Sequence, residues 1–291
     1  MTAGLVFIDK PQGWTSHDIV AKLRGIAGTR RVGHAGTLDP MATGLLVLGI
    51  DAGTKLLTFL VGANKTYEAR IRLGASTITD DAEGEILESR DASKITRADI
   101  EKQLVKLRGA ILQVPSSVSA IKVDGERAYA KVRGGDQVKL AARQVTIHKF
   151  EVTSEPEVTS EFLDFDAIIE CSSGTYIRAL ARDLGNALEV GGHLTALRRT
   201  QVGGYNVEDA QSMEVLTREN LNVTPLAVAA ANNFEVLQLS QQDVIDLRHG
   251  KRIVGDIKST PAAGICNGEM IAMLQPVDGK LKSVVVFAEE V

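Results

Sequence analysis

Apolar residues recur at the spacing of an α-helix in three stretches of this chain, residues 15–26, 96–107 and 177–188. The first two stretches open with Thr-x-x-Asp, the pattern of a capping box, and a glycine closes each of them. The third stretch is entered through Gly174 and Thr175. The pattern therefore predicts three amphipathic helices.

Several shorter stretches have the pattern of β-strands. Residues 67–73 alternate between apolar and charged side chains, with Tyr67 on the apolar side, which is typical of a half-buried strand. Residues 45–50 form an apolar run that fits a strand buried on both faces, and residues 145–152 and 165–171 also look extended. Because the regular βαβ alternation and glycine fingerprint of a doubly wound sheet are missing, we expect an α+β domain with a mixed sheet.

The composition shifts near an alanine-rich run at residues 227–231, which leads to a predicted domain boundary. Beyond it, two strand-like segments, 270–274 and 281–287, flank Asp278 and Gly279. Asp-Gly between such segments is a strong signal for a β-hairpin. We therefore predict two domains, residues 1–232 and a small, mostly β domain at residues 233–291.

Length and cysteine usage limit the class of protein further. A chain of 291 residues exceeds the usual size of one domain, and it has no apolar run near the roughly 18 to 20 residues that span a bilayer. The first ten residues carry neither a basic leader nor a small-residue cleavage site. The two cysteines, Cys171 and Cys266, lack the spacing of a zinc site and suit a reducing compartment. We expect a cytoplasmic protein without a membrane span or a metal site.

The net charge of −4 at first disfavours a polyanionic partner, but the charge is unevenly distributed. Residues 80–101 carry a net charge of −5 and residues 151–170 a net charge of −7, so the remaining 249 residues carry +8. This distribution permits RNA binding. Aromatic residues make up only 4% of the chain, so shape and a local pocket should matter more than base stacking.

The stretch from Gly33 to Gly44 is the most informative motif, because it sets an Asp-Pro pair among three glycines. Pro40 lacks a backbone N–H and disfavours the helical region for the residue before it. Asp39 is therefore suited to the N-cap position with Pro40 as the first helical residue, and the simplest interpretation from spacing alone is that Asp39 merely caps a turn. The glycines add a weak indication that the backbone approaches another molecule closely.

This motif closely resembles the active-site motif of the TruB family, the bacterial pseudouridine synthases that modify the T loop of tRNA. Further blocks follow in the family's order: residues 9–16, 65–69, 114–116 with 119–122, 174–178, and 197–199 with Val202. The resemblance spans about 200 residues and thins after about Gln211. It implies a pseudouridine synthase fold, with a mixed, largely antiparallel central sheet flanked by helices, and a PUA-like C-terminal domain. From Asn233 onward six bases face eight acids, which puts RNA contact by that domain in doubt.

The resemblance implies that Asp39 is the nucleophile, Arg178 its charge partner and Tyr67 the residue that packs on the target uracil. It also implies contacts to the RNA or substrate from seven residues: Lys10, His34, Gly36, Thr37, Tyr176, Leu197 and Arg198. For Lys10 the role is structural or phosphate-facing. The implied reaction is the isomerisation of one T-loop uridine in tRNA, without a cofactor or metal, by a monomer that needs no protein partner.

Physical arguments support these roles and leave alternatives open. A carboxylate can attack C6 of the uracil or the anomeric carbon, and the sequence does not choose between them. Arg178 would keep that carboxylate ionised in a water-poor pocket, although most arginines are exposed on helix faces. Tyr67 is a core aromatic or a stacking partner of the base, and a phenol is a poor proton acceptor at neutral pH. His34 makes a local hydrogen bond or fills the space left by an extruded uridine.

Two other functions compete with this interpretation. Residues 49–54, Gly-Ile-Asp-Ala-Gly-Thr, resemble the phosphate loop of sugar kinases and actin-like ATPases, but no second such loop follows. A non-catalytic RNA chaperone would open the tRNA elbow with the same basic surface. The substitution Asp39→Asn separates chaperone from isomerase, because only an isomerase should lose product formation.

Overall fold

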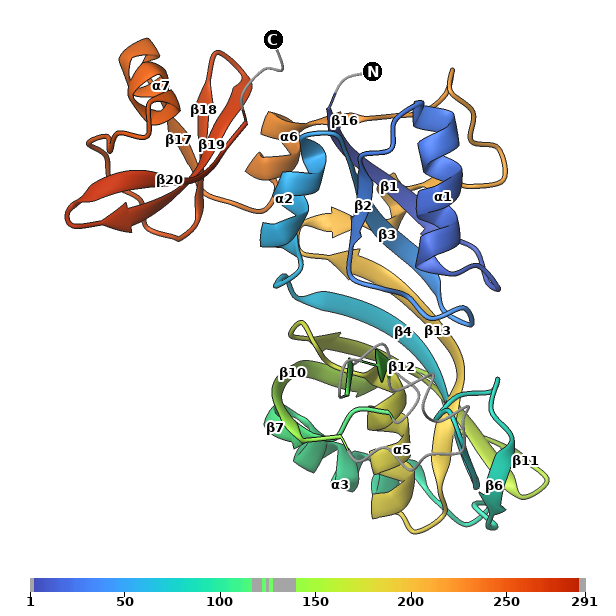
Figure 1. Cartoon of the computed structure of the whole chain (residues 1–291). Helices are drawn as coiled ribbons and strands as arrows, with labels where there is room; N and C mark the ends of the chain where they lie inside the picture. The colour runs from blue at the N-terminus through green and yellow to red at the C-terminus, as the bar shows by residue number, and fades with distance from the viewer. Residues whose placement is uncertain (1–2, 117–121, 124–125, 128–139, 288–291) are drawn as a thin grey trace. The chain divides into compact units, whose positions relative to one another are not determined.

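The computed structural model describes residues 3–116, 122–123, 126–127 and 140–287 of the chain, which packs as two compact units (Figure 1). Unit 1 comprises Met1–Pro40, Gly44–Gly62 and Val202–Val291, and unit 2 comprises Met41–Thr43 and Ala63–Gln201. Each unit has its own hydrogen-bonded strands and its own helices. Among the described residues, none of the helices has the length and apolar character that crossing a membrane requires.

The first part of unit 1 consists of mostly antiparallel strands with helices in contact with them. Its elements are β1 (Gly4–Lys10), α1 (Ser16–Ala27), β2 (Val32–Ala35), β3 (Thr43–Ile50), α2 (Gly53–Leu60), β14 (Tyr205–Asn206), η1 (Val207–Asp209), β15 (Gln211–Ser212), β16 (Thr224–Pro225) and α6 (Leu226–Ala231). β3 pairs antiparallel with both β1 and β2, and β15 adds to β1 in parallel. The predicted strand at 45–50 is confirmed within β3, which is buried along nearly its whole length.

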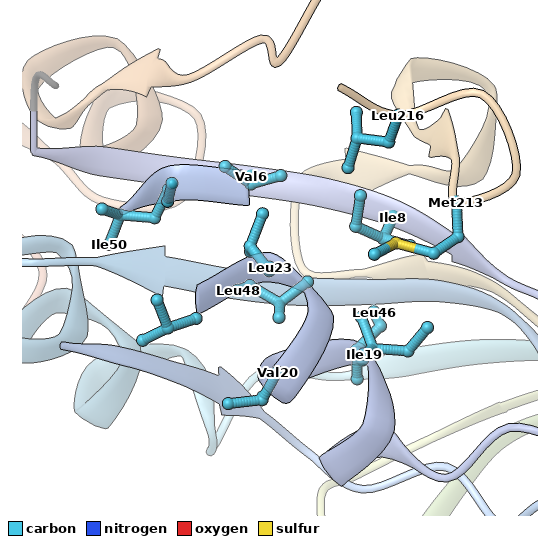
Figure 2. Packing of buried hydrophobic residues seen from close by; sticks show 12 residues of the cluster. Val6, Ile8, Ile19, Val20, Leu23, Leu46, Leu48, Ile50, Met213 and Leu216 are labelled. Atoms are coloured by element: carbon cyan, nitrogen blue, oxygen red, sulfur yellow. The ribbon is translucent and has the colours of Figure 1, made fainter. Parts of the chain in front are cut away.

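The predicted helix at 15–26 is confirmed as α1, with both hydrogen bonds of its capping box formed by Thr15 and Asp18. Gly28 ends the helix in the left-handed conformation that glycine adopts without strain. Figure 2 shows Ile19, Val20 and Leu23 of α1 pointing into a cluster of side chains from β1 and β3. The amphipathic pattern therefore fixes the helix to the sheet.

The C-terminal part of unit 1 is a four-stranded sheet with one helix. Its elements are β17 (Val236–Gln238), α7 (Gln241–Arg248), β18 (Ala262–Cys266), β19 (Glu269–Val277) and β20 (Lys280–Val286), in the order β17-β18-β19-β20. The predicted hairpin is confirmed, since Asp278 and Gly279 connect β19 to β20 with φ of 52° and 72°. This part has a hydrophobic cluster of its own. The predicted boundary after residue 232 remains a prediction.

Unit 2 is built on a second set of strands, in the order β13-β4-β12-β10-β7. Its elements are β4 (Lys65–Leu73), β5 (Ala75–Thr77), β6 (Ile86–Ser89), α3 (Arg97–Leu107), β7 (Gly109–Gln113), β8 (Lys122–Val123), β9 (Glu126–Arg127), β10 (Arg143–Val152), β11 (Glu157–Thr159), β12 (Phe162–Cys171), α5 (Ile177–Ala187) and β13 (Gly192–Val202). α3 packs on β10 and α5 on β4, and the two helices contact each other. The predicted helices and the half-buried strand at 67–73 are confirmed.

The acidic stretches bond to arginines of their own unit. On the outward face of β4, Arg72 binds Asp164 of β12 at 2.7 Å, and Arg70 binds Asp166 and Glu157. Opposite charges directly across a pair of strands stabilise the pairing modestly. Arg70 and Arg72 contribute to the net charge of +8 that the residues outside 80–101 and 151–170 carry. Because both arginines are paired with carboxylates, the positive charge available to bind RNA is smaller than +8.

Candidate active site

Asp39 lies in the turn between β2 and β3, and no helix begins at Pro40. The prediction of a helix that begins at Pro40 was therefore wrong, whereas the simpler interpretation of a turn fits, because Pro40 and Met41 lie in a turn. β3 begins at Thr43, which leaves only two residues after Pro40 before the chain becomes extended. The Asp-Pro pair instead opens a turn, a use that the same backbone preference of proline allows.

The two neighbours of Asp39 are held by residues near the start of α1. The hydroxyl of Ser16 accepts the N–H of Leu38 at 2.9 Å and donates to its carbonyl at 3.1 Å. The carbonyl of Pro40 accepts the N–H of Gly13 at 2.8 Å. Because the backbone is bound on both sides, the position of Asp39 within unit 1 is well defined. The sequence analysis included Ser16 in the motif block 9–16 but gave it no role.

Lys10 is fully buried at the end of β1. Its ammonium donates to the carbonyls of Trp14 at 2.6 Å, Pro11 at 3.0 Å and Pro40 at 3.3 Å. Charge-assisted hydrogen bonds of this kind fix the loop before α1 to the turn that carries Asp39. This placement favours the structural alternative for Lys10 over a contact with phosphate.

The remaining candidates of unit 1 lie in β2 or on the connection from β2 to β3 that carries Asp39. His34 is in β2, opposite Leu48 of β3. Gly36 has a φ of 89°, a conformation that favours glycine, and the side chain of Thr37 is exposed. All five candidates, Lys10, His34, Gly36, Thr37 and Asp39, therefore belong to unit 1, and Lys10 is hydrogen-bonded to the turn that carries Asp39.

Arg178 is the second residue of α5 and is only 4% exposed, so the interpretation as an arginine on a solvated helix face is wrong. Its guanidinium donates to the carbonyl of Thr79 at 2.7 Å and lies 3.5 Å from Oδ2 of Asp81. A buried guanidinium requires such partners, because burial without them is costly.

Asp81 is a site residue that sequence analysis missed. Its other carboxylate oxygen accepts the hydroxyl of Thr79 at 2.5 Å and the N–H of Glu83 at 3.0 Å. The side chain is 4% exposed, although Asp81 belongs to the acidic stretch 80–101. No periodicity marks a residue in a turn, so only its burial beside Arg178 identifies it.

Tyr67 is nearly buried on the inner face of β4, opposite Ile169 of β12. Lys65 lies two residues before it on the same face, where burial and then the charge of Arg199 lower the pKa of Lys65 to about 8. Opposite Lys65, burial raises the pKa of the Cys171 thiol to about 11. Cys171 is therefore a thiol at neutral pH and a poor nucleophile.

Three further candidates lie in unit 2. Tyr176 immediately precedes α5, and both of its backbone groups bond to the side chain of Gln113. Leu197 and Arg198 lie in β13, and the carbonyl of Leu197 accepts the hydroxyl of Thr43 at 3.5 Å. Unit 2 thus holds Tyr67, Tyr176, Arg178, Leu197 and Arg198. In the block 119–122, residues 119–121 lie outside the described residues.

The kinase-like stretch 49–54 is a strand-to-helix turn whose polar groups bond within the chain. Asp51 accepts the hydroxyl of Thr29 at 2.8 Å, and the hydroxyl of Thr54 donates to the carbonyl of Asp51 at 2.7 Å. A Cβ on Gly49 would lie 2.6 Å from the backbone of Gly53, so this glycine serves the packing of α2 on β3. These contacts account for the motif without a nucleotide.

The fold is that of the pseudouridine synthases. One similar solved structure is an H/ACA ribonucleoprotein bound to a substrate RNA containing 2′-deoxyuridine, with a TM-score of 0.72 and 22% identity over 98% of this chain and 85% of that chain. An archaeal box H/ACA Nop10–Cbf5 complex gives a TM-score of 0.68 and 21% identity over 98% of this chain and 85% of that chain. These similarities establish the architecture.

Sequence comparison defines the family. Residues 24–177 match the model of the TruB family pseudouridylate synthase N-terminal domain. Residues 178–225 match the tRNA pseudouridylate synthase B C-terminal domain, and residues 234–288 match the C-terminal domain of tRNA pseudouridine synthase II. The tRNA pseudouridine synthase B of Paenarthrobacter aurescens is 54% identical over 99% of this chain and 96% of its own length. That of Thermobifida fusca is 53% identical over 99% of each chain. The chain belongs to the TruB family of pseudouridylate synthases.

Proposed function

We propose that this enzyme converts one uridine in the T loop of tRNA to pseudouridine, with Asp39 as the nucleophile. The observation that carries this assignment is the turn 36–42, in which Ser16, Lys10 and Gly13 bind the residues on either side of Asp39. A preorganised carboxylate is what nucleophilic catalysis requires. The substrate follows from the relatives, which are named tRNA pseudouridine synthase B.

The reaction needs no net change in atoms or oxidation state. The bond from C1′ to N1 breaks, the uracil turns, C1′ joins C5, and the proton on C5 leaves while N1 gains one. Asp39 divides this rearrangement into two steps by a covalent bond to C6 of the ring or to C1′, and it is released at the end. The uridine must first leave its stack, which costs a few kcal/mol of unstacking free energy.

Arg178 supplies the positive charge that keeps the nucleophile ionised when the base displaces water. This role comes from the family motif and is supported by the burial of Arg178 and its bonds to Thr79 and Asp81. Because these partners hold the guanidinium in one orientation, little reorganisation is needed during the reaction.

The other candidates complete the proposal. Tyr67 packs on the uracil, and His34 contacts the position from which the base has moved. Gly36, Thr37, Tyr176, Leu197 and Arg198 contact the RNA or the substrate, and Lys10 supports the turn of Asp39. We further propose that the enzyme acts as a cytoplasmic monomer, with a synthase domain up to residue 232 and a PUA-like domain from residue 233.

The substitution Asp39→Asn tests the assignment, because it keeps the shape of the side chain and removes its nucleophilicity. We expect no detectable pseudouridine when the variant is incubated with an unmodified tRNA transcript and the product is mapped at single-nucleotide resolution. RNA affinity and the melting temperature should stay near those of the wild type.

Asp243→Asn is the matched control, because Asp243 caps α7 and has no part in the site. This variant should retain wild-type turnover. Wild-type product formation by Asp39→Asn would refute the assignment of the nucleophile. If the chain were only a chaperone, Asp39→Asn should keep the wild-type activity, whereas an isomerase should lose product formation.

A further inference from the structure

The helix that carries Arg178 has no side-chain cap of its own. α1, α3 and α7 each begin with a complete capping box, formed from Thr15, Thr96 and Ser240. α5 begins after Tyr176, whose side chain makes no capping hydrogen bond. The first N–H groups of a helix lack partners within it and need partners from elsewhere, such as other side chains or water.

Gln113, the last residue of β7, provides bonds at this position. Its Nε2 donates to the carbonyl of Tyr176 at 3.0 Å, and its Oε1 accepts the N–H of Tyr176 at 2.9 Å. Gln113 is only 1% exposed, so both hydrogen bonds are shielded from water. A planar amide that bonds to both backbone groups of one residue fixes the direction of the chain as well as its position.

The next residue, Val114, is also bonded to α5. Its carbonyl accepts a hydrogen bond from Arg182 at 2.7 Å, and Arg182 in turn lies 3.2 Å from Asp80. Gln113 therefore bonds to Tyr176, two residues before Arg178, and Val114 bonds to Arg182, four residues after it. The turn that contains Asp80 and Asp81 pairs with Arg182 and Arg178, one helical turn apart on α5.

We propose that Gln113 is a positioning residue for the isomerisation, which sets the first turn of α5 and so the location of the Arg178 guanidinium. This inference rests on the proposed function, because it takes Arg178 to serve the nucleophile. Arg178 follows Tyr176 by two residues, so a shift of the Tyr176 peptide moves the guanidinium relative to Thr79 and Asp81. A misplacement of about 1 Å at a catalytic group costs roughly 100-fold in rate.

The test replaces Gln113 with methionine, which has a similar length and cannot form either hydrogen bond. We expect the single-turnover rate of pseudouridine formation to fall about 10- to 100-fold, with the Kd for tRNA within about twofold of the wild type. Thr96→Ala, which removes the cap of α3 in the same unit, should lower the melting temperature and leave the rate unchanged. A purely structural role for Gln113 would give the same result as this control.

The combination with Arg178→Lys separates action through Arg178 from an independent effect. If Gln113 acts through Arg178, Gln113→Met should change the rate of the Arg178→Lys enzyme by less than about twofold. A wild-type rate in folded Gln113→Met, or rate losses that multiply in the double variant, would overturn the inference. If Gln113→Met unfolds at the assay temperature, Gln113→Asn carries the same test, because its amide is too short to reach both groups.

Failure of this inference differs from failure of the proposed function. In the first case Asp39→Asn and Arg178→Lys remain defective while Gln113→Met turns over normally or behaves independently. In the second case Arg178→Lys itself turns over at the wild-type rate, which removes the role of Arg178 and this inference with it.

Discussion

Asp81→Asn is the substitution for which the structure gives the most specific expectation. Oδ1 of Asp81 accepts two hydrogen bonds, from the hydroxyl of Thr79 and the N–H of Glu83, while Oδ2 faces Arg178 at 3.5 Å. An asparagine must keep its oxygen at the first position to satisfy those two donors. Its NH2 group then faces the guanidinium, so a donor replaces the negative charge that Arg178 had beside it.

The magnitude follows from burial, because the side chains of Arg178 and Asp81 are 5% and 4% exposed. Removing one partner of a buried ion pair costs about 3–5 kcal/mol of the free energy of unfolding. The retained bonds to Thr79 and Glu83 place our expectation at about 3 kcal/mol, the lower end of that range. The guanidinium should also shift from its position, so the single-turnover rate should fall by roughly 100-fold.

The assay combines urea denaturation with single-turnover pseudouridine formation. Asp166→Asn is the matched control, because it breaks an exposed Asp–Arg pair on the outward face of the same unit. Exposed pairs contribute about 1 kcal/mol or less, and turnover should be unchanged in this control. If the two variants were alike in both stability and rate, the argument that Asp81 holds Arg178 would fail.

Two other predictions follow. Arg178→Lys should lose most of its single-turnover rate, because a point charge cannot reproduce the planar fork of a guanidinium, and near-normal turnover would place the essential charge elsewhere. The buried Lys65 should make stability depend on pH. Burial, and then the charge of Arg199, lowers the pKa of Lys65 from 10.5 to about 8. Between these two pH values the unfolded chain therefore binds more protons than the folded chain. As pH increases from about 8 to about 10, the wild type should therefore gain free energy of unfolding relative to Lys65→Met. If the difference between the urea midpoints of the two proteins stayed constant over this range, the assigned pKa would be contradicted.

The sequence by itself determined the local structure and the family. The capping boxes at Thr15 and Thr96, the alternation from Tyr67 onward and the Asp-Gly hairpin are all formed as predicted. These signals succeed because they depend on residues within a few positions of one another, where backbone preference and burial act together. The ordered motif blocks likewise indicated the family that the comparisons establish.

Only the tertiary structure decided which side chains hold the candidate site residues. Ser16 binds the turn of Asp39, Asp81 binds Arg178, and Gln113 binds the start of α5, each across a long separation in sequence. A helix that begins at Pro40 was ruled out for the same reason, since the nearby start of β3 leaves no room for it. Periodicity reports whether a residue is buried, but the partner of a buried polar group depends on which distant segments the fold brings together.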